Sequence, residues 1–568
     1  MSYGGASFSI RRRRDSPVRR LTPLIIAVLL CRAAFGIGVA MRTPAWEAQD
    51  EPFHFAYAAQ IARQGTLPDS NNPMHIHPPA YHALVAAFMW LSGSTQTPLA
   101  PPDHNWYFYE GNGGINFALP ARTLEQRSTE RDLIAARLFT AILAIVGVAV
   151  VWRTARRAGL KAPFALIGTL FFACHPQALF SSSTLSNDAA ALLIGALIIW
   201  SVVAAMQRRS ARLALLGLGL SGVGNLFKLN ILPLTIAACL ALALCLSWRR
   251  AVGYALISAA MLGLGTLIIR ETGILLPFAA EVGGRAAPLA LWERLQSDLG
   301  GVLFREALQH GALSAFGVFG WGTVRLPLWT VGALWLGALI GTIGIARLWR
   351  VRLLWALISA CGALVIAAAA LSLLYYNPQL LNSRYLLPSL AAWAILLALG
   401  WSALSKIGRY AGTGTVCGMV ALSAWLGWGG LAAVYAPPIQ FVAVPEGQSI
   451  ALMPEISLRS YEVLSPSVRG GESLEVALIW AADGDISENY TLRLAFVGAD
   501  GNIYGWLYTF HGAGRYPTGV WRAGTAFREV YRVPIRSDVP VPSAGYLQVM
   551  LVELEHAILL DSIPISVR

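Results

Sequence analysis

The sequence predicts a polytopic α-helical membrane protein of about eleven transmembrane helices, followed by a C-terminal all-β sandwich domain. Three observations lead to this class. First, 56% of the 568 residues are hydrophobic and only 13% are charged, which is too apolar for a soluble globular chain of this length. Second, many apolar runs approach the roughly 20 residues that span a bilayer. Third, from about residue 437 short stretches alternate apolar and polar residues.

The helical elements follow from the apolar runs. Residues 1–20 form a basic tail, and the first run after it is too long for a signal peptide. Arg32 and Arg42 also stand where a small-residue cleavage site would be expected, which predicts an uncleaved span. The predicted spans lie near 21–41, 132–152, 163–182, 188–206, 213–228, 229–247, 251–270, 327–346, 353–376, 385–404 and 415–435.

The basic residues predict the orientation of these spans. They lie in short links that all fall on one side of the membrane, which the positive-inside rule places in the cytoplasm. The net charge of +13 therefore reflects membrane topology, and nucleic acid is not a predicted partner. The N-terminus is expected inside, with structured loops 42–131 and 271–326 outside. The basic clusters are Arg11–Arg14, Arg153/Arg156/Arg157/Lys161, Arg208/Arg209/Arg212, Arg249/Arg250, Arg347/Arg350/Arg352 and Lys406/Arg409.

Residues 437–568 predict the β-sandwich. The stretches GGESLEVALIWAA, NYTLRLAFVGADGNIYGWLYTF and AGYLQVMLVELE alternate apolar and polar residues between Gly, Asp and Pro turn signals. None of the six cysteines lies in this region, so no disulfide framework is expected there. The domain is predicted outside the cytoplasm, tethered to the last span.

The first candidate chemistry lies just after the first span, in WEAQDEPFHFAY. Pro52 suits the first turn of a helix, and the apolar stripe after it predicts an interfacial helix over 52–64. The helix dipole favours the ionised form of Asp50 and Glu51 at its N-terminal end. Such carboxylates can act as a base or hold a divalent cation. The alternative is helix capping alone, with Glu51 as the expected cap position.

A second candidate element is HIHPPAYH. If the chain is extended there, His75 and His77 point to the same side, and the proline after His77 favours that conformation. Such a pair could bind phosphate or a metal, or could simply be polar side chains at a bilayer interface. A zinc hydrolase is not supported, because HExxH is missing and a proline breaks the helical spacing between Glu51 and His54.

Further polar residues map to the outer ends of predicted spans. Ionisable groups near the bilayer are costly and indicate function. Lys228 and Arg384 suit a lipid-linked phosphate, the arginine as a bidentate fork and the lysine as a point charge. The alternatives are capping, snorkelling and headgroup anchoring. The candidate substrate contacts of this group are Asn187, Asp188, Lys228, Trp321, Arg384 and Tyr385.

Six motifs appear in the order DEPFHFAYAAQIARQGTLP, HPPAYHALVAAF, NDAAALL, FKLNILPL, FGVFGWGTVRLPL and NSRYLLPSLAAWAILLALG. Together they resemble a bacterial family of polytopic membrane proteins of formerly unknown function that is allied to the GT-C glycosyltransferases. The resemblance covers roughly residues 20–435. The Asp-Glu pair and the His-Pro-Pro element are its most specific parts. The stretch YPTGVWRAGTAFREVYRVPI resembles a β-sandwich module appended to such enzymes.

The resemblance implies a GT-C-like domain over 21–436 in the bacterial cytoplasmic membrane. GT-C enzymes pass a sugar from a polyprenyl-phosphate or diphosphate donor to an acceptor outside the cytoplasm. Here the acceptor would be a glycan or another lipid-linked sugar, and one in-line displacement would invert the anomeric centre. Carried over, Asp50 is the base and Glu51 its partner, and both are the candidate ligands of a divalent cation (Mg or Mn). His54, His77, Lys228 and Arg384 are candidate phosphate contacts.

Two other functions stay open. A transporter or flippase of lipid-linked glycans should place charges or broken helices near the bilayer midplane, whereas the mid-sections of these spans are almost free of charge. A non-catalytic scaffold that binds glycans through the β-sandwich predicts that Asp50→Asn changes nothing in cells. The glycosyltransferase hypothesis predicts loss of activity.

Overall fold

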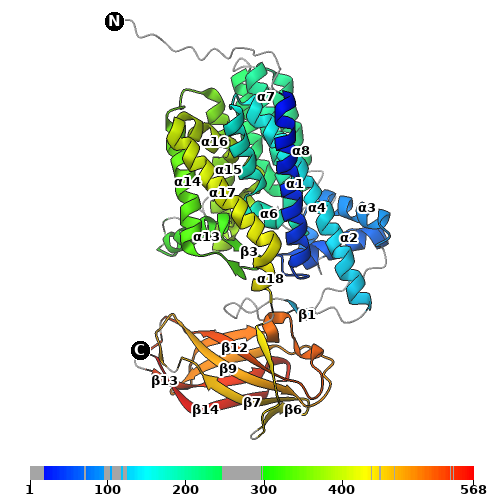
Figure 1. Ribbon diagram of the computed structural model, residues 1–568, viewed down its shortest axis with the longest axis vertical. Helices are drawn as coiled ribbons and strands as arrows, with labels where there is room; N and C mark the ends of the chain where they lie inside the picture. The colour runs from blue at the N-terminus through cyan, green and yellow to red at the C-terminus, as the bar shows by residue number, and fades with distance from the viewer. Residues whose placement is uncertain are drawn as a thin grey trace.

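The computed structural model describes residues 18–567 apart from 70–71, 95–102, 105–116, 119–123, 246–295 and 297, and a few single positions and pairs after 375. The predicted span near 251–270, residues 271–295 of the predicted loop 271–326 and residues 1–17 of the basic tail therefore lie outside the described residues. The helices form one elongated bundle, and the strands β5–β14 form a second body at one of its ends (Figure 1). The short helix α18, Leu431–Val434, leads from one to the other.

Seven helical segments of the described residues are long and apolar enough to cross a membrane, or eight if a bent pair counts as one span. This confirms the predicted class. The bent pair is α5 and α6, which meet at 49° on either side of His175, where Pro176 begins the second helix. The spans comprise α1 (Val18–Arg42), α4 (Leu124–Arg157), α7 (Asp188–Arg208), α14 (Leu328–Ala346), α15 (Arg352–Leu374), η4–α16 (Ser383–Ser389, Leu390–Ala403), α17 (Ser405–Trp425) with α18, and the pair α5–α6 (Ala162–Ala173, Pro176–Ser183).

Two predictions about the spans need correction. The last span begins at Ser405, not near 415, because Lys406 and Arg409 are exposed on the first turns of its helix instead of forming a link. The segment predicted at 213–228 forms a helix of 14 residues, shorter than the roughly 20 that span a bilayer. The segment predicted at 229–247 is helical up to Cys245, after which the described residues are interrupted, so its full length stays a prediction. The two segments are α8 (Ala211–Gly224) and the pair η2 (Leu229–Leu234) and α9 (Thr235–Cys245), where Pro233 keeps the first turns of the second segment in a 3₁₀ conformation.

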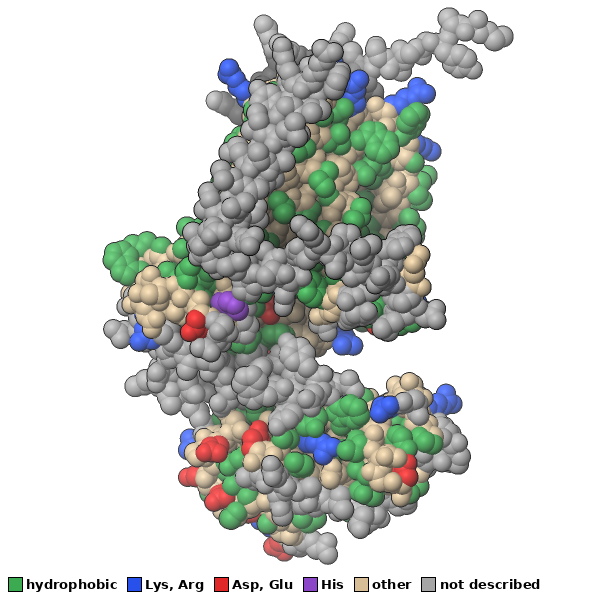
Figure 2. Space-filling view, turned by 180° about the vertical axis from the view of Figure 1, so that it is seen from behind, with side chains coloured by type: hydrophobic (Ala, Val, Ile, Leu, Met, Phe, Trp, Pro, Cys, Tyr) green, Lys and Arg blue, Asp and Glu red, His purple; other side chains and the backbone are tan. Residues whose placement is uncertain are grey.

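Several exposed basic residues lie at the end of the bundle away from the β strands, where Figure 2 shows Lys and Arg side chains. They include Arg153 near the end of α4, Arg208 at the end of α7 and Lys406 at the start of α17. The candidate residues of the first outer loop lie at the opposite end. This cluster of basic residues agrees with the positive-inside pattern, while the orientation in a membrane stays a prediction.

The segment between α1 and α4, predicted as the first outer loop, carries three short helices. They are α2 (Glu51–Gln64), η1 (Pro73–Ile76) and α3 (Ala80–Leu91). The helix expected over 52–64 is confirmed, but its N-cap is Asp50 and not Glu51. The extended arrangement expected for His75 is wrong, because the Asn72 side chain accepts a hydrogen bond from the N–H of Met74 and caps a 3₁₀ turn.

Close helix contacts hold α7 against η4. A Cβ added at Gly195 of α7 would lie 2.0 Å from the carbonyl oxygen of Pro388 in η4. Only glycine allows this approach, so the backbones of α7 and η4 are in direct contact. The contact matters because η4 carries Arg384, and α7 begins with Asp188.

The C-terminal part consists of two five-stranded sheets with the orders β11-β10-β13-β14-β8 and β5-β12-β9-β7-β6. All pairs are antiparallel except β14–β8. Both sheets contribute to one core, with Trp480, Phe496 and Phe527 fully buried, which confirms the all-β prediction. The strands are β5 (Ile439–Val442), β6 (Ile450–Met453), β7 (Ile456–Val463), β8 (Ser467–Val468), β9 (Ser473–Ala482), β10 (Leu492–Gly498), β11 (Ile503–Thr509), β12 (Ala526–Pro534), β13 (Ser543–Leu551) and β14 (His556–Val567).

Candidate functional site

Glu51 and Arg137, which lies in the first half of α4, form a fully buried ion pair. The Nε of Arg137 donates to Oε1 of Glu51 at 2.7 Å, and Nη2 donates to Oε2. The backbone N–H groups of Leu185 and Trp46 donate to the same carboxylate at 2.9 and 3.2 Å. A carboxylate accepts about four hydrogen bonds, so Glu51 has no acceptor position left for a substrate. The Glu51 carboxylate is thus saturated by protein donors, which distinguishes it from the neighbouring Asp50.

Arg137 was not among the residues that the sequence singled out. Its remaining N–H groups donate to the carbonyl oxygens of Ala40, Thr43 and Pro44 at 2.8, 2.6 and 2.9 Å. Together with the two bonds to Glu51, they use all the donors of a guanidinium. Full satisfaction of this kind offsets the desolvation cost of a buried pair. The available signal was a lone charge inside the apolar run predicted at 132–152.

Asp50 has different surroundings. It is the N-cap of α2 in a left-handed conformation, with φ 66°, and its side chain makes no cap hydrogen bond. The carboxylate instead pairs with the guanidinium of Arg384. Its side chain is 18% exposed, against 0% for Glu51. Left-handed φ is uncommon for a residue other than glycine, and here it points the carboxylate away from the helix that it would otherwise cap.

A second ion pair lies beside the first. Asp188, the first residue of α7, pairs with Nζ of Lys228. The Lys228 ammonium and the Arg384 guanidinium lie 5.6 and 5.1 Å from the centre of the Tyr385 ring. Two carboxylates and two cations therefore gather around one tyrosine. Oδ2 of Asp188 and Nε of Arg384 are buried and have no hydrogen-bond partner within the described part of the chain.

Histidines form the wall toward α2 and α3. Nδ1 of His54 lies 2.9 Å from Nε2 of His82, and the ring centres of His54 and His77 are 5.6 Å apart. Burial and the neighbouring His82 hold the pKa of His54 well below its usual value. Burial, with Lys228 adding repulsion, lowers the pKa of His77 to about 4. These rings are therefore neutral near pH 7.

Neutral His77 connects this wall to α7. Its Nδ1 lies 3.1 Å from Nδ2 of Asn187, and since an amide nitrogen only donates, Nδ1 accepts. The N–H groups of Asn187 also reach the carbonyl oxygen of Phe227 at 3.4 Å, next to Lys228. His77 and Asn187 thus join the segment that carries Lys228.

Two predicted contacts lie elsewhere. Nδ1 of His75 bonds the carbonyl oxygen of Asn72 at 2.9 Å, within its own turn. Nε1 of Trp321 donates to the carbonyl oxygen of Trp46 at 3.0 Å. Trp321 therefore holds the backbone just before Asp50. The structure brings together Asp50, His54, His77, Asn187, Asp188, Lys228, Arg384 and Tyr385.

A small polar cavity opens beside Asp188 and Arg384. It measures about 20 Å³, which is room for about one water. Most of its other walls are hydroxyl and amide side chains that can hydrogen-bond a sugar or a phosphate. They are Gln49, Gln177, Ser181, Thr184, Ser186 and Asn382. Of these residues, only Asn382 was predicted, as a polar residue at the end of a span, although SSSTLSND is rich in hydroxyls.

Asp50 and Glu51 do not fit a divalent cation in this arrangement. Asp50 faces the guanidinium of Arg384, and the oxygens of Glu51 accept four N–H groups. A cation site needs several free oxygen ligands. Among the described residues, no group of three or more His, Cys, Asp and Glu side chains is placed to hold a metal.

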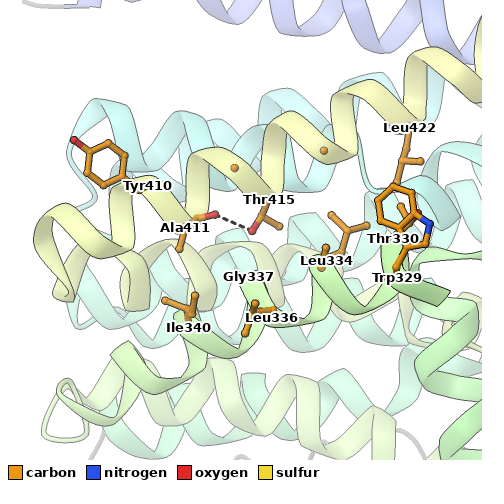
Figure 3. A pocket seen from close by; sticks show the side chains of 13 residues that line it. Trp329, Thr330, Leu334, Leu336, Gly337, Ile340, Tyr410, Ala411, Thr415 and Leu422 are labelled. Atoms are coloured by element: carbon orange, nitrogen blue, oxygen red, sulfur yellow. Dashed lines mark hydrogen bonds between the residues drawn. The ribbon is translucent and has the colours of Figure 1, made fainter. Parts of the chain in front are cut away.

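A larger apolar groove runs between α14 and α17 (Figure 3). It measures about 350 Å³ and extends from Trp329 to Tyr410. Its one drawn hydrogen bond, from Oγ1 of Thr415 to the carbonyl oxygen of Ala411 at 2.8 Å, stays within α17. The groove offers shape for an apolar chain but no titratable group except the Tyr410 phenol.

A family model described as dolichyl-phosphate-mannose-protein mannosyltransferase matches residues 129–253. No curated protein matches the chain significantly. The matched stretch contains Asp188 and Lys228, and with the helical fold it supports a membrane glycosyltransferase of the GT-C type.

Proposed function

We propose that the protein transfers a sugar from a polyprenyl-phosphate or polyprenyl-diphosphate donor to a glycan or lipid-linked acceptor. The reaction takes place on the outer face of the bacterial cytoplasmic membrane. One observation carries the proposal: the pairs Asp50–Arg384 and Asp188–Lys228 meet around Tyr385 at the end of the spans. The lipid of such a donor stays in the bilayer, so its phosphate must be bound near the ends of the membrane-spanning helices.

The cations bind the donor phosphate. Arg384 and Lys228 both lie close to the Tyr385 ring, at 5.1 and 5.6 Å from its centre. A phosphate that enters replaces carboxylate oxygens at the guanidinium fork and at the ammonium. During transfer, the same two groups stabilise the charge that develops on the departing phosphate. The hydroxyl and amide side chains of the polar cavity beside them can hydrogen-bond the sugar.

Asp50 serves as the base. When the phosphate takes over Arg384, the Asp50 carboxylate is free to accept a proton from the acceptor hydroxyl. The acceptor oxygen bonds to the anomeric carbon while the carbon–oxygen bond to phosphate breaks, and phosphate keeps the electron pair. A base of this kind contributes roughly 10²–10⁴-fold to the rate. One carboxylate is enough, because phosphate is already a good leaving group.

Glu51 and the histidines have supporting roles in this mechanism. Glu51 with Arg137 fixes the backbone on which Asp50 stands, so Glu51 is a positioning residue. His54 and His77 supply neutral ring nitrogens beside the cations. Neutral imidazoles leave the charge balance of the two ion pairs unchanged.

One observation favours a transporter or flippase as the second candidate. Arg32 is buried in the middle of α1 and donates to the carbonyl oxygen of Ala178 and to Ser182, both on the bent pair α5–α6. Charges and broken helices near the midplane are typical of transporters. Against it, the four charges that gather around Tyr385 lie at the ends of the helices.

The two candidates differ in whether a bond breaks. The test uses the full chain in nanodiscs with labelled polyprenyl-phosphate-mannose, the donor class that the matching family's description suggests, and parallel donors with other sugars. The glycosyltransferase releases polyprenyl phosphate and a new glycoside, and Asp50→Asn removes both. A flippase moves the intact donor between the leaflets of a vesicle, and Asp50→Asn leaves the rate of this movement unchanged.

A further inference from the structure

The segment Trp46–Asp50 has a backbone that its own sequence does not favour. Trp46 has φ 71° and Asp50 has φ 66°, and both are left-handed conformations that cost free energy for residues other than glycine. Such conformations persist only where the surroundings hold them. The N–H of Trp46 donates to Glu51, and its carbonyl oxygen accepts from Trp321.

The β domain supplies a further restraint. Nη2 of Arg515 lies 3.3 Å from Oε1 of Glu47, with side-chain exposures of 13% and 5%. The same guanidinium lies 4.5 Å from the centre of the Tyr435 ring, which ends α18. A charge pair out of bulk water is stronger than one at the surface. Glu47 is the second residue of the segment, three positions before Asp50.

Burial raises the pKa of the Glu47 carboxyl to about 7, and the Arg515 guanidinium opposes this rise. Arg515 is thus the group that favours the ionised form of Glu47. Removing the guanidinium would remove the ion pair that offsets the burial of the Glu47 carboxylate in this position.

A hairpin closes the other side of the contact. Its strands are β3 (Val318–Phe319) and β4 (Val324–Arg325). A Cβ at Gly320, in the turn with φ 62°, would lie 2.9 Å from both the carbonyl oxygen of Glu47 and Oη of Tyr435. The first outer loop, the hairpin, the end of the last span and the β domain therefore meet around Glu47.

The β domain presents Arg515 on a rigid loop. Gly512, Ala513 and Gly514 all have positive φ. Oε1 of the buried Glu529 accepts from the N–H of Gly512 at 2.9 Å, and Oε2 accepts from the Tyr531 hydroxyl at 2.5 Å. A buried carboxylate is costly unless its hydrogen bonds are satisfied, and here they fix the loop that leads to Arg515.

We propose that Arg515 is a positioning residue for the Trp46–Asp50 segment, so that the β domain forms part of the scaffold of the site. The role of Asp50 in this inference rests on the proposed function. The ordering of the segment by Arg515 does not. The β domain is then a structural partner of the membrane domain and not a freely tethered module.

Hydrogen exchange of the full chain in nanodiscs tests the ordering. Arg515→Gln and Glu47→Gln should each speed exchange of the amides in 46–51 by about tenfold, and the double variant should not exceed the single ones. The matched control is Arg459→Gln, because Arg459 pairs with Asp483 within the β domain and should leave the segment unchanged. Arg515→Lys should restore part of the protection.

A merely structural effect on the β domain has a different signature. It would speed exchange in β9 and β12, whereas positioning changes only the segment. Glu47→Gln leaves the β-domain sequence native and keeps the test valid if Arg515→Gln misfolds. Unchanged exchange of 46–51 in Glu47→Gln would overturn the inference.

Failure of this inference and of the proposed function can be told apart. If Asp50→Asn abolishes transfer while Arg515→Gln leaves hydrogen exchange of the segment unchanged, only the positioning role fails. If Arg515→Gln loosens the segment while Asp50→Asn keeps full transfer, the contact stands and the proposed function fails.

Discussion

The carboxylate of Asp50 pairs with the guanidinium of Arg384, which lies 334 residues further along the chain. This contact joins the first outer loop to the 3₁₀ turn that opens the span at Ser383–Ala403. Donor binding and sugar transfer at this site should therefore change when either Asp50 or Arg384 is substituted.

Arg384→Lys should weaken binding of farnesyl phosphate, used as a soluble lipid-phosphate probe, by about tenfold. Lysine keeps the charge but loses the bidentate fork. Arg384→Gln should weaken binding further. Titration calorimetry measures both, with Arg325→Gln as the control because Arg325 is exposed. Equal affinities for wild type and Arg384→Gln would contradict phosphate recognition by this side chain.

Glu51→Gln should lower the stability of the protein by about 3–5 kcal/mol, because breaking a fully buried pair leaves the Arg137 charge uncompensated. Thermal unfolding in nanodiscs measures the change. Arg131→Gln is the matched control, since Arg131 is 75% exposed and its pair with Asp132 is worth about 0–1 kcal/mol. If Glu51→Gln unfolds like the control, the pair does not hold the loop.

Acid should destabilise the protein through His77. Its pKa falls from an ordinary value of 6.5 to about 4 in the folded chain. Between these values the unfolded state binds the extra proton, so this contribution to stability is present above about pH 6.5 and is lost as the pH falls toward about 4. Unfolding temperatures across this range measure it, and His77→Asn should flatten the curve. If His77→Asn leaves the pH dependence of the unfolding temperature unchanged, the effect comes from other groups.

Gly195→Ala should separate α7 from η4. The new Cβ would lie 2.0 Å from the carbonyl oxygen of Pro388, so the elements that carry Asp188 and Arg384 must move apart. We expect a loss of at least about 1–3 kcal/mol of stability and weaker binding of farnesyl phosphate. Gly219→Ala is the control, because nothing lies within 4 Å of its Cβ position. Matching behaviour of the two variants would show that the contact is not tight.

Regular elements could be predicted from the sequence because their signals are local. Apolar length identified most of the spans, alternation identified the β domain, and Pro52 located the start of α2. The short α8 and the break at His175 depend on how helices pack, which composition does not reveal. The turn at His75 depends on a cap from Asn72 that the prediction ignored.

The site residues could be proposed from chemistry and position, but their partners could not. Asp50 and Glu51 are adjacent carboxylates, yet one faces Arg384 and the other is saturated by Arg137. Both partners are far away in the sequence. The contact of Arg515 with Glu47 joins two domains across 468 positions, and no periodicity or motif marks such a pair.

The role of Asp50 as the base is tested by single-turnover transfer from a labelled polyprenyl-phosphate sugar, comparing wild type with Asp50→Asn at equal folded amounts. Asp50→Asn keeps the size of the side chain and removes the proton acceptor. We predict a rate at least about 100-fold lower for the folded variant, with membrane insertion like that of the wild type. Transfer at the wild-type rate by folded Asp50→Asn protein would contradict the mechanism.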